Sequence, residues 1–149
     1  MRAMRWWDIE AVMRIERAVF PDDAWTTTMF WSELAQRDSR FYLVEEGSDG
    51  DLVGYAGLCA YPPHEAYVQT IAVAGPAQGR GRGAALLVAL IEEATRRGAV
   101  HLDLEVRADN EVAQRLYRAH EFTAIATRRG YYQPGGIDAV VMRRELAAA

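Results

Sequence analysis

Apolar side chains near the start of the chain recur with the spacing of an amphipathic helix. The apolar positions are Ile9, Val12, Met13 and Phe20, and Glu16 stands at the same spacing. Asp8 is a typical N-cap residue and Pro21 follows the last position, so we expect a helix between them. A second helix is predicted to begin near residues 26–28. Its expected apolar face consists of Phe30, Trp31 and Leu34.

Three strands are predicted in the middle of the chain, at residues 41–46, 52–61 and 66–73. They contain the aromatic and β-branched residues that are typical of strands. The stretch GSDGD at 47–51 has the glycine and aspartate residues of a hairpin loop. This part of the chain therefore predicts antiparallel pairing.

The most regular helical pattern follows a glycine-rich stretch. Its apolar positions are Leu86, Leu87, Leu90, Ile91 and Ala94. Gly98 is the expected C-cap, and residues 100–107 then alternate apolar and polar side chains as in a strand with one apolar face. Strand 66–73, this helix and strand 100–107 form a βαβ crossover, which makes the two strands a parallel pair.

A shorter helix at 110–119 and strands near 122–127 and 137–144 complete the pattern. The predicted fold class is mixed α/β (α+β), with a central, mostly antiparallel sheet, one parallel βαβ pair and about four flanking helices. At 149 residues, 50% apolar and 26% charged, the chain suits one globular domain spanning 1–149.

Composition excludes several classes of protein. Cys59 is the single cysteine, so no internal disulfide or cysteine-based zinc site is expected, and no spacing of His, Asp and Glu suggests a metal. A net charge of −4 argues against direct nucleic-acid binding. No apolar run is long enough to span a membrane, and acidic residues come too early for a signal peptide. We expect a cytoplasmic protein.

The stretch VAGPAQGRGRGAALL at residues 73–87 brings glycines and arginines to the start of a helix. Free N–H groups and the helix dipole make such a start an anion site, and glycine lets a phosphate approach closely. A P-loop is excluded because the chain has no lysine. Gly79, Gly81 and Ala84 match the dinucleotide pattern G-x-G-x-x-A, but too little chain follows for that fold. Gln78, Gly81 and Gly83 match Q-x-x-G-x-G.

That last loop and several further motifs resemble the GNAT superfamily of N-acetyltransferases across nearly the whole chain, and within it the ribosomal-protein alanine N-acetyltransferases of the RimI type. The motifs are YVQTIAV, LEVRADNEVAQRLYRAHEF, FPDDAWT, RRGYY and DAVVM. The resemblance implies transfer of acetyl from acetyl-CoA to the α-amine of a protein N-terminus, an alanine of a small-subunit ribosomal protein.

The resemblance also implies where the cofactor binds. The pantetheine arm is expected against the backbone of Ile71, Ala72 and Val73. The pyrophosphate is expected on the loop formed by Gly79, Arg80, Gly81, Arg82, Gly83 and Ala84. Arg80 and Arg82 either add positive charge there or are solvated side chains beside the loop.

By the same resemblance Glu105 is the general base, Asn110 a cofactor ligand and Tyr117 the general acid. Asn110, Ala113 and Tyr117 share one helical stripe by their spacing. The amine must be neutral to attack a thioester, and the leaving thiolate benefits from a weak acid nearby. The alternatives are a surface carboxylate for Glu105 and a core ring for Tyr117.

Other assignments stay open. His64 and Glu65 could relay a proton. Tyr131 and Tyr132 of RRGYY are expected to line the peptide groove, the alternative being ordinary hairpin packing. Glu121 stands where many relatives have a glycine that closes a helix, which predicts a cost of about 1 kcal/mol or a changed turn. Acetylation of a small amine or a lysine, or acyl-CoA sensing without turnover, are the alternative functions.

Overall fold

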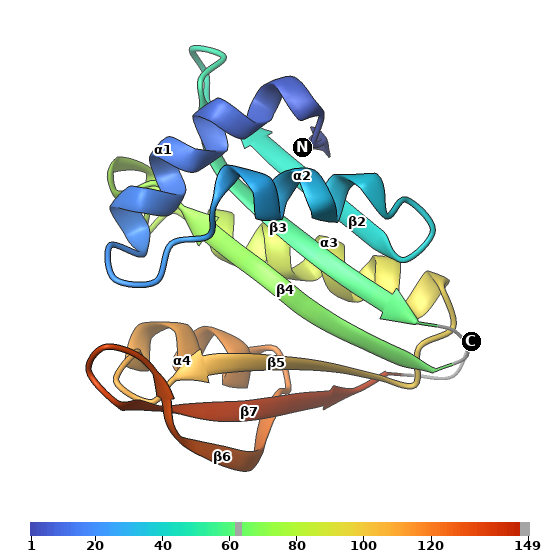
Figure 1. The fold of residues 1–149 in the computed structure, drawn as a ribbon. Coiled ribbons are helices and arrows are strands. Elements are labelled where there is room, and N and C mark those ends of the chain that lie inside the picture. The colour runs from blue at the N-terminus through green and yellow to red at the C-terminus, as the bar shows by residue number, and fades with distance from the viewer. Residues whose placement is uncertain (62–63, 147–149) are drawn as a thin grey trace.

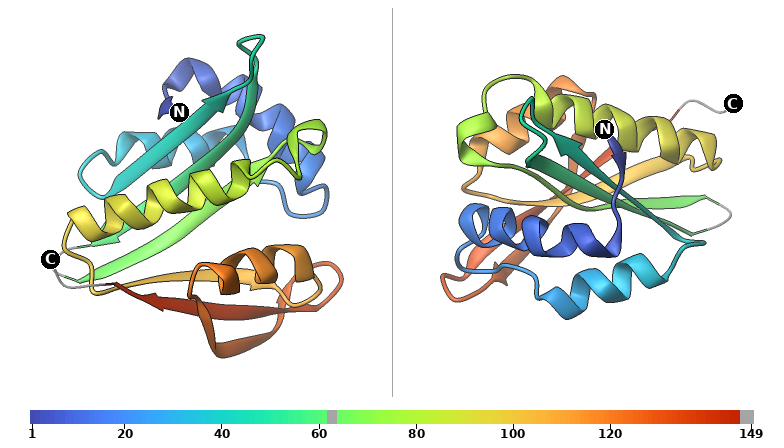
Figure 2. Two further views of the ribbon diagram at one scale, coloured as in Figure 1. Left: turned by 180° about the vertical axis from the view of Figure 1, so that it is seen from behind. Right: turned by 90° about the horizontal axis from the view of Figure 1, so that it is seen from above.

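The computed structural model describes residues 1–61 and 64–146 and shows one twisted sheet with helices on both faces (Figures 1 and 2). The strands are β1 (Arg2–Ala3), β2 (Arg40–Glu46), β3 (Leu52–Tyr61), β4 (Glu65–Val73), β5 (His101–Arg107), β6 (Thr123–Tyr132) and β7 (Ile137–Glu145). The helices are α1 (Ile9–Val19), α2 (Thr27–Ala35), α3 (Arg82–Arg96) and α4 (Glu111–Ala119), with short 3-10 turns η1 (Trp6–Asp8) and η2 (Gly75–Ala77).

The sheet has seven strands in the order β1-β2-β3-β4-β5-β7-β6. All neighbouring strands run antiparallel except β4 and β5, which are joined through α3 and run parallel. The predicted fold class is therefore confirmed, including the single parallel pair.

The parallel pair is short and then opens. Pairing between β4 and β5 covers only Glu65 with His101, Ala66 with Leu102 and Tyr67 with Asp103. Beyond these three pairs the two strands separate towards their carboxyl ends, while each keeps its pairing with β3 or β7 (Figure 1). The sheet consequently has an opening between residues 68–73 of β4 and residues 104–107 of β5.

Two hydrophobic cores lie on the two faces of the sheet. One core packs α3 and α4 against Leu102, Leu104 and Val106 of β5. The other packs α1 and α2 against Tyr42, Tyr55 and Ala72. The view from above in Figure 2 shows the sheet between these helix layers. Because side chains alternate along a strand, Glu105 and Arg107 point to the α1–α2 face.

The start of the first helix differs from the prediction. Asp8 precedes α1 but its carboxylate does not cap that helix. It accepts hydrogen bonds from both terminal nitrogens of Arg2 and from the N–H of Arg5, each at 2.8 Å. The guanidinium of Arg2 holds the pKa of the Asp8 carboxyl below its usual value. Asp8 therefore fixes the chain before the helix.

The second helix is confirmed, although one of its predicted core residues is not in the core. Thr26 is the N-cap, and its hydroxyl accepts a hydrogen bond from the N–H of Met29 at 3.2 Å. Phe30 is fully buried, but Trp31 is 47% exposed and stacks on exposed Trp6. The apolar stripe of this short helix is narrower than the pattern indicated.

Two helix ends have a residue with positive φ. Gly98, with φ of 86°, follows the last turn of α3, as the prediction of a glycine stop requires. After α4 the same role falls to Glu121, whose φ is 68°. The expected left-handed position is confirmed, and a residue with a Cβ occupies it.

Candidate active site

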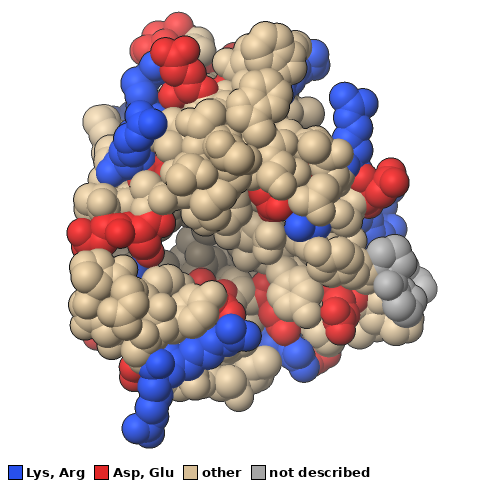
Figure 3. All heavy atoms as spheres, viewed as in Figure 1, with Lys and Arg blue, Asp and Glu red and all other residues tan. Residues whose placement is uncertain are grey.

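A cavity of about 670 Å³ occupies the opening between β4 and β5. Figure 3 shows it as a hollow in the molecular surface. Most of the predicted site residues line it, namely Ile71, Ala72, Val73, Gly79, Gly81, Arg82, Gly83, Ala84, Glu105, Asn110, Tyr117 and Tyr132. Arg80 is exposed outside the lining, and Tyr131 lies outside it as well.

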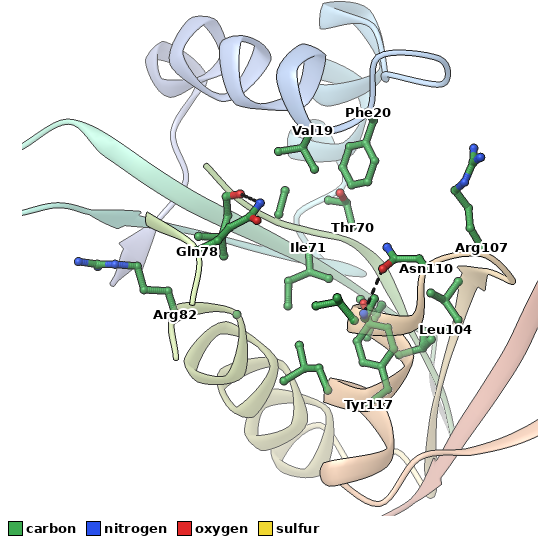
Figure 4. Close-up of a pocket in the computed structure, with 18 of the residues that line it drawn as sticks. Val19, Phe20, Thr70, Ile71, Gln78, Arg82, Leu104, Arg107, Asn110 and Tyr117 are labelled. Atoms are coloured by element: carbon green, nitrogen blue, oxygen red, sulfur yellow. Dashed lines mark hydrogen bonds between the residues drawn. The ribbon is translucent and has the colours of Figure 1, made fainter. Parts of the chain in front are cut away.

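The glycine loop turns the chain sharply into α3. Gly79 and Gly81 have φ of 78° and 77°, a conformation that favours glycine, and nothing lies within 4 Å of where a Cβ would stand on either. Gln78 ties the loop to β4, because its side-chain nitrogen donates to the carbonyl of Val73 at 2.9 Å (Figure 4). The free N–H groups of the first turn of α3 therefore border the cavity and form an anion site.

The two arginines of the loop do not act as a pair of free charges. Arg82 extends away from the cavity (Figure 4), and its guanidinium contacts Glu45 of β2 at 3.3 Å. The Arg82 side chain is 26% exposed. Its positive charge is thus largely matched by Glu45, and the backbone amides are the main groups that the loop offers to an anion.

The edge of β4 that faces the opening has free backbone groups. Ile71, Ala72 and Val73 pair with β3 on one side only, since the pairing with β5 ends at Tyr67. Apart from the Val73 carbonyl, which accepts from Gln78, alternate N–H and C=O groups along that edge can bind amide groups of an extended ligand. The edge leads from the opening to the glycine loop.

Tyr117 and Asn110 reach the cavity from α4, on the same face as α3. Tyr117 is 6% exposed, packs against Phe122, and burial raises the pKa of its hydroxyl, so the phenol stays protonated at neutral pH. The described residues donate or accept no hydrogen bond at that hydroxyl. Asn110 is the N-cap rather than part of the helix, and its Oδ1 accepts from the N–H of Ala113 at 3.1 Å. Its amide nitrogen points into the cavity (Figure 4).

Glu105 approaches the cavity from the opposite face of the sheet. Its side chain is 29% exposed, and Oε1 lies 3.2 Å from Nε of Arg128 on β6. The negative charge of Glu105 raises the pKa of Tyr131, and burial together with that charge raises the pKa of Tyr132 to about 12. The predicted base and the predicted acid therefore meet at one opening from two faces.

The sequence did not indicate that Arg128 contacts Glu105, or which hydrogen bond fixes the chain around Arg128. The guanidinium of Arg128 lies over the ring of Tyr131 at 5.4 Å. The register between β6 and β7 shifts between Arg128 and Tyr132, and Gly130 at this irregularity donates its N–H to the carboxylate of Asp138 at 2.9 Å. The RRGYY motif is thus an irregular part of strand β6. The DAVVM motif supplies the aspartate that fixes it.

His64 and Glu65, the candidates for a proton relay, lie away from the main cavity. Glu65 pairs with His101 at the closed end of the two parallel strands, far along β4 from the opening. His64 and Glu65 border a separate small hollow with Arg37 and Arg97. Cys59 is buried and lies outside the lining of the main cavity.

Two further observations concern residues 1–61 and 64–146. No group of three or more His, Cys, Asp and Glu side chains in this part of the chain is arranged to hold a metal ion. None of the helices in it combines the length and the apolar character that a membrane crossing demands.

Comparisons with known proteins agree with this geometry. Residues 9–122 match the family described as Acetyltransferase (GNAT) family. N-alpha-acetyltransferase RimI of Mycobacterium tuberculosis is 42% identical over 142 residues, covering 93% of this chain and 87% of the relative. The [Ribosomal protein bS18]-alanine N-acetyltransferase of Escherichia coli K12 is 35% identical over 139 residues, covering 91% of this chain and 89% of the relative.

Solved structures extend the similarity. The crystal structure of the ribosomal-protein-S18-alanine N-acetyltransferase from Escherichia coli superposes with a TM-score of 0.82 at 31% identity, covering 99% of this chain and 94% of the other. The crystal structure of Ard1 from Thermoplasma volcanium superposes with a TM-score of 0.88 at 26% identity, covering 98% of this chain and 96% of the other.

Proposed function

The chain belongs to the Acetyltransferase (GNAT) family and is an acetyl-CoA-dependent N-acetyltransferase, and we propose that its acceptor is the N-terminal alanine of ribosomal protein bS18. The proposal rests on relatives whose names state this activity and which match this chain over most of both lengths. Such an acceptor implies that the enzyme works in the cytoplasm, where ribosomal proteins are made.

The observation that carries the proposal is the opening in the sheet, which can be reached from both faces. We propose that acetyl-CoA binds on the α3–α4 face, with its pyrophosphate on the amides of residues 79–84 and its pantetheine arm along the free edge of β4. Asn110 would bind the cofactor through its free amide nitrogen. The amine would enter from the α1–α2 face beside Glu105, Tyr131 and Tyr132.

The roles of Glu105 and Tyr117 follow from this arrangement. The amine nitrogen attacks the thioester carbonyl, so that an N–C bond forms and the C–S bond breaks. Glu105, directly or through water, accepts the proton that the amine loses, and Tyr117 donates a hydrogen bond or proton to the departing sulfur. Direct attack needs no acetyl-enzyme, and buried Cys59 takes no part.

The acidity of the acceptor favours an α-amine over a lysine. An α-amino group has a pKa near 7.7–8.0 and a lysine side chain near 10.4, so at pH 7 roughly a tenth of the first but only about 4 in 10⁴ of the second is neutral. A single carboxylate at the site can therefore deprotonate an N-terminal amine more easily than a lysine side chain.

Mass spectrometry tests the proposed acceptor. A peptide that begins with alanine and contains an internal lysine is incubated with enzyme and acetyl-CoA, beside the same peptide with a blocked N-terminus and a set of small amines. We expect acetylation of the α-amine alone. If blocking the N-terminus leaves the rate unchanged, or if only the small amines react, the acceptor is a lysine or a small molecule. Binding of acetyl-CoA with no turnover on any acceptor would indicate a sensor.

A further inference from the structure

Glu16 is the most deeply buried charged side chain among the described residues. Only 2% of it is exposed, and it projects from α1 into the core between that helix and the sheet. Burial raises the pKa of its carboxyl, and no described residue forms an ion pair with it. A buried carboxylate without a positive partner is costly, so its hydrogen bonds must account for its presence.

Both oxygens of this carboxyl group are used. Oε1 accepts a hydrogen bond from the hydroxyl of Tyr55 in β3, and Oε2 accepts one from the backbone N–H of Trp25 at 2.9 Å. The backbone carbonyl of Glu16 also accepts from the N–H of Phe20 at 2.8 Å. The backbone bond to Phe20 ends α1, and the carboxylate of Glu16 holds the far end of the following loop at Trp25 and joins it to the centre of the sheet.

This loop forms a wall of the cavity on the α1–α2 face. Val19, Phe20, Asp23 and Trp25 line the cavity together with Glu16 itself. In Figure 4, Val19 and Phe20 project from the end of α1 towards Thr70. The ring of Trp25 packs against Phe30, and Phe30 packs against Tyr55, so the hydrogen bonds of Glu16 close a packed ring of contacts.

We propose that Glu16 is a positioning residue for the acceptor: it fixes the loop of residues 20–26 in the shape that receives the amine substrate. The inference rests on the proposed function, because that function assigns the α1–α2 face to the acceptor. Loss of the carboxylate leaves the N–H of Trp25 without its partner and frees the loop. We expect the glycine loop to be unaffected, because the Glu16 carboxylate bonds only to Trp25 and Tyr55 among the described residues.

Glu16→Ala and Glu16→Gln separate this role from a general loss of stability. In Glu16→Ala we expect the KM for an alanine peptide to rise about tenfold or more, since an unpaired buried donor disfavours the productive loop. The affinity for acetyl-CoA, measured by calorimetry, should stay within about twofold. Glu16→Gln should restore most of the peptide affinity, because its side-chain oxygen can accept from Trp25 and its NH2 group can donate to the hydroxyl of Tyr55.

Val12→Ala is the matched control. Val12 is fully buried in the same helix and core but does not line the cavity, so its truncation destabilises the protein without touching the loop contacts. We expect an unchanged peptide KM. If the peptide KM of Val12→Ala rises as much as that of Glu16→Ala, Glu16 contributes only to stability. The same conclusion follows if Glu16→Ala loses as much affinity for acetyl-CoA as for the peptide.

Hydrogen exchange tests the loop without any acceptor. The amide of Trp25 should exchange faster in Glu16→Ala than in the wild type or in Val12→Ala. Tyr55→Phe, which removes one hydroxyl, is the milder variant should Glu16→Ala not fold, and we expect a smaller change in the same direction. Unchanged exchange at Trp25 in every variant contradicts the inference. Failure of the wild type to acetylate alanine peptides would overturn the proposed function instead.

Discussion

The two halves of the cavity are built in different ways. The half on the α3–α4 face includes three consecutive stretches of sequence that offer backbone groups, the end of β4, the glycine loop and the start of α3, and side chains of α4 such as Tyr117 complete it. The half on the α1–α2 face consists of side chains from separate segments, which are held by contacts such as those of Glu16 with Tyr55 and of Arg128 with Glu105.

This difference suggests a division of labour. Backbone amides cannot be changed by substitution without changing the chain conformation, so they suit a cofactor that stays the same. Side chains held by long-range contacts can change one at a time, so they suit an acceptor site that differs between related enzymes. Substitutions in the two halves should therefore affect different kinetic constants.

The largest effect is expected in the cofactor half. Gly81→Asp places a carboxylate, at a backbone position with φ of 77°, where the cofactor phosphates are expected. Acetyl-CoA affinity by calorimetry should fall about 10²-fold or more, because both charge and conformation oppose binding. Gly75→Asp is the control, since Gly75 is exposed and outside the cavity lining. Equal affinity in the folded Gly81→Asp variant refutes the phosphate assignment.

Tyr117→Phe should lower turnover and leave binding nearly intact. The ring keeps its packing against Phe122, but the hydroxyl that would assist the leaving sulfur is removed. We expect kcat to fall about 10²-fold, the usual size of general acid catalysis, with unchanged acetyl-CoA affinity. Tyr61→Phe, at an exposed position outside the cavity, should behave as wild type. If Tyr117→Phe keeps native turnover, Tyr117 is not the general acid and only packs in the core.

Tyr132→Ala should act on the acceptor alone. Tyr132 lines the cavity, and Arg107 lies over its ring at 5.5 Å. Its truncation should raise the peptide KM about tenfold, the usual cost of removing an aromatic contact. The acetyl-CoA affinity should be unaffected. Ile125→Ala, an exposed change in the same strand, provides the comparison. If both variants have native peptide KM values, the tyrosine only packs in its hairpin.

The smallest effect concerns stability near Tyr117. Glu121→Gly relieves a left-handed residue and should stabilise the fold by about 1 kcal/mol, seen as a higher Tm. The same substitution removes the ion pair between Glu121 and Arg144, and this loss offsets part of the gain in stability. The loss is small because the Glu121 side chain is largely exposed. Glu121→Gln keeps the strain and loses the ion pair, so it measures that loss separately. A Glu121→Gly variant no more stable than Glu121→Gln contradicts the strain argument.

The sequence predicted the cofactor half well because its signals are local. Gly98 and the glycines of the loop each specify a chain conformation within a few residues, and the strands around β4 follow from short apolar patterns. The separation of β4 and β5 depends on how many residues of the two strands pair, and no local sequence pattern indicates that number. The sequence therefore indicated which residues meet but not that they meet at an opening in the sheet.

The acceptor half was harder to predict because its contacts join distant residues. Glu16 stands in the apolar stripe of the first helix, a signal that it is buried, yet its partners lie 9 and 39 residues away. Arg128 gave no sign of pairing with Glu105. His64 and Glu65 lie at the start of β4, where it pairs with β5, and no local pattern indicated that the opening forms at the other end of the strand. Trp31 fits the helical period but remains exposed.

A crystal structure with a bisubstrate conjugate, in which CoA is joined through an acetyl group to the nitrogen of an alanine peptide, tests the central claim most directly. The account predicts that CoA lies between α3 and α4 with its pyrophosphate on residues 79–84. The peptide should pass through the opening to the α1–α2 face, with its nitrogen beside Glu105 and the sulfur beside Tyr117. A peptide that leaves on the α3–α4 face, away from Glu105 and the loop held by Glu16, would contradict it.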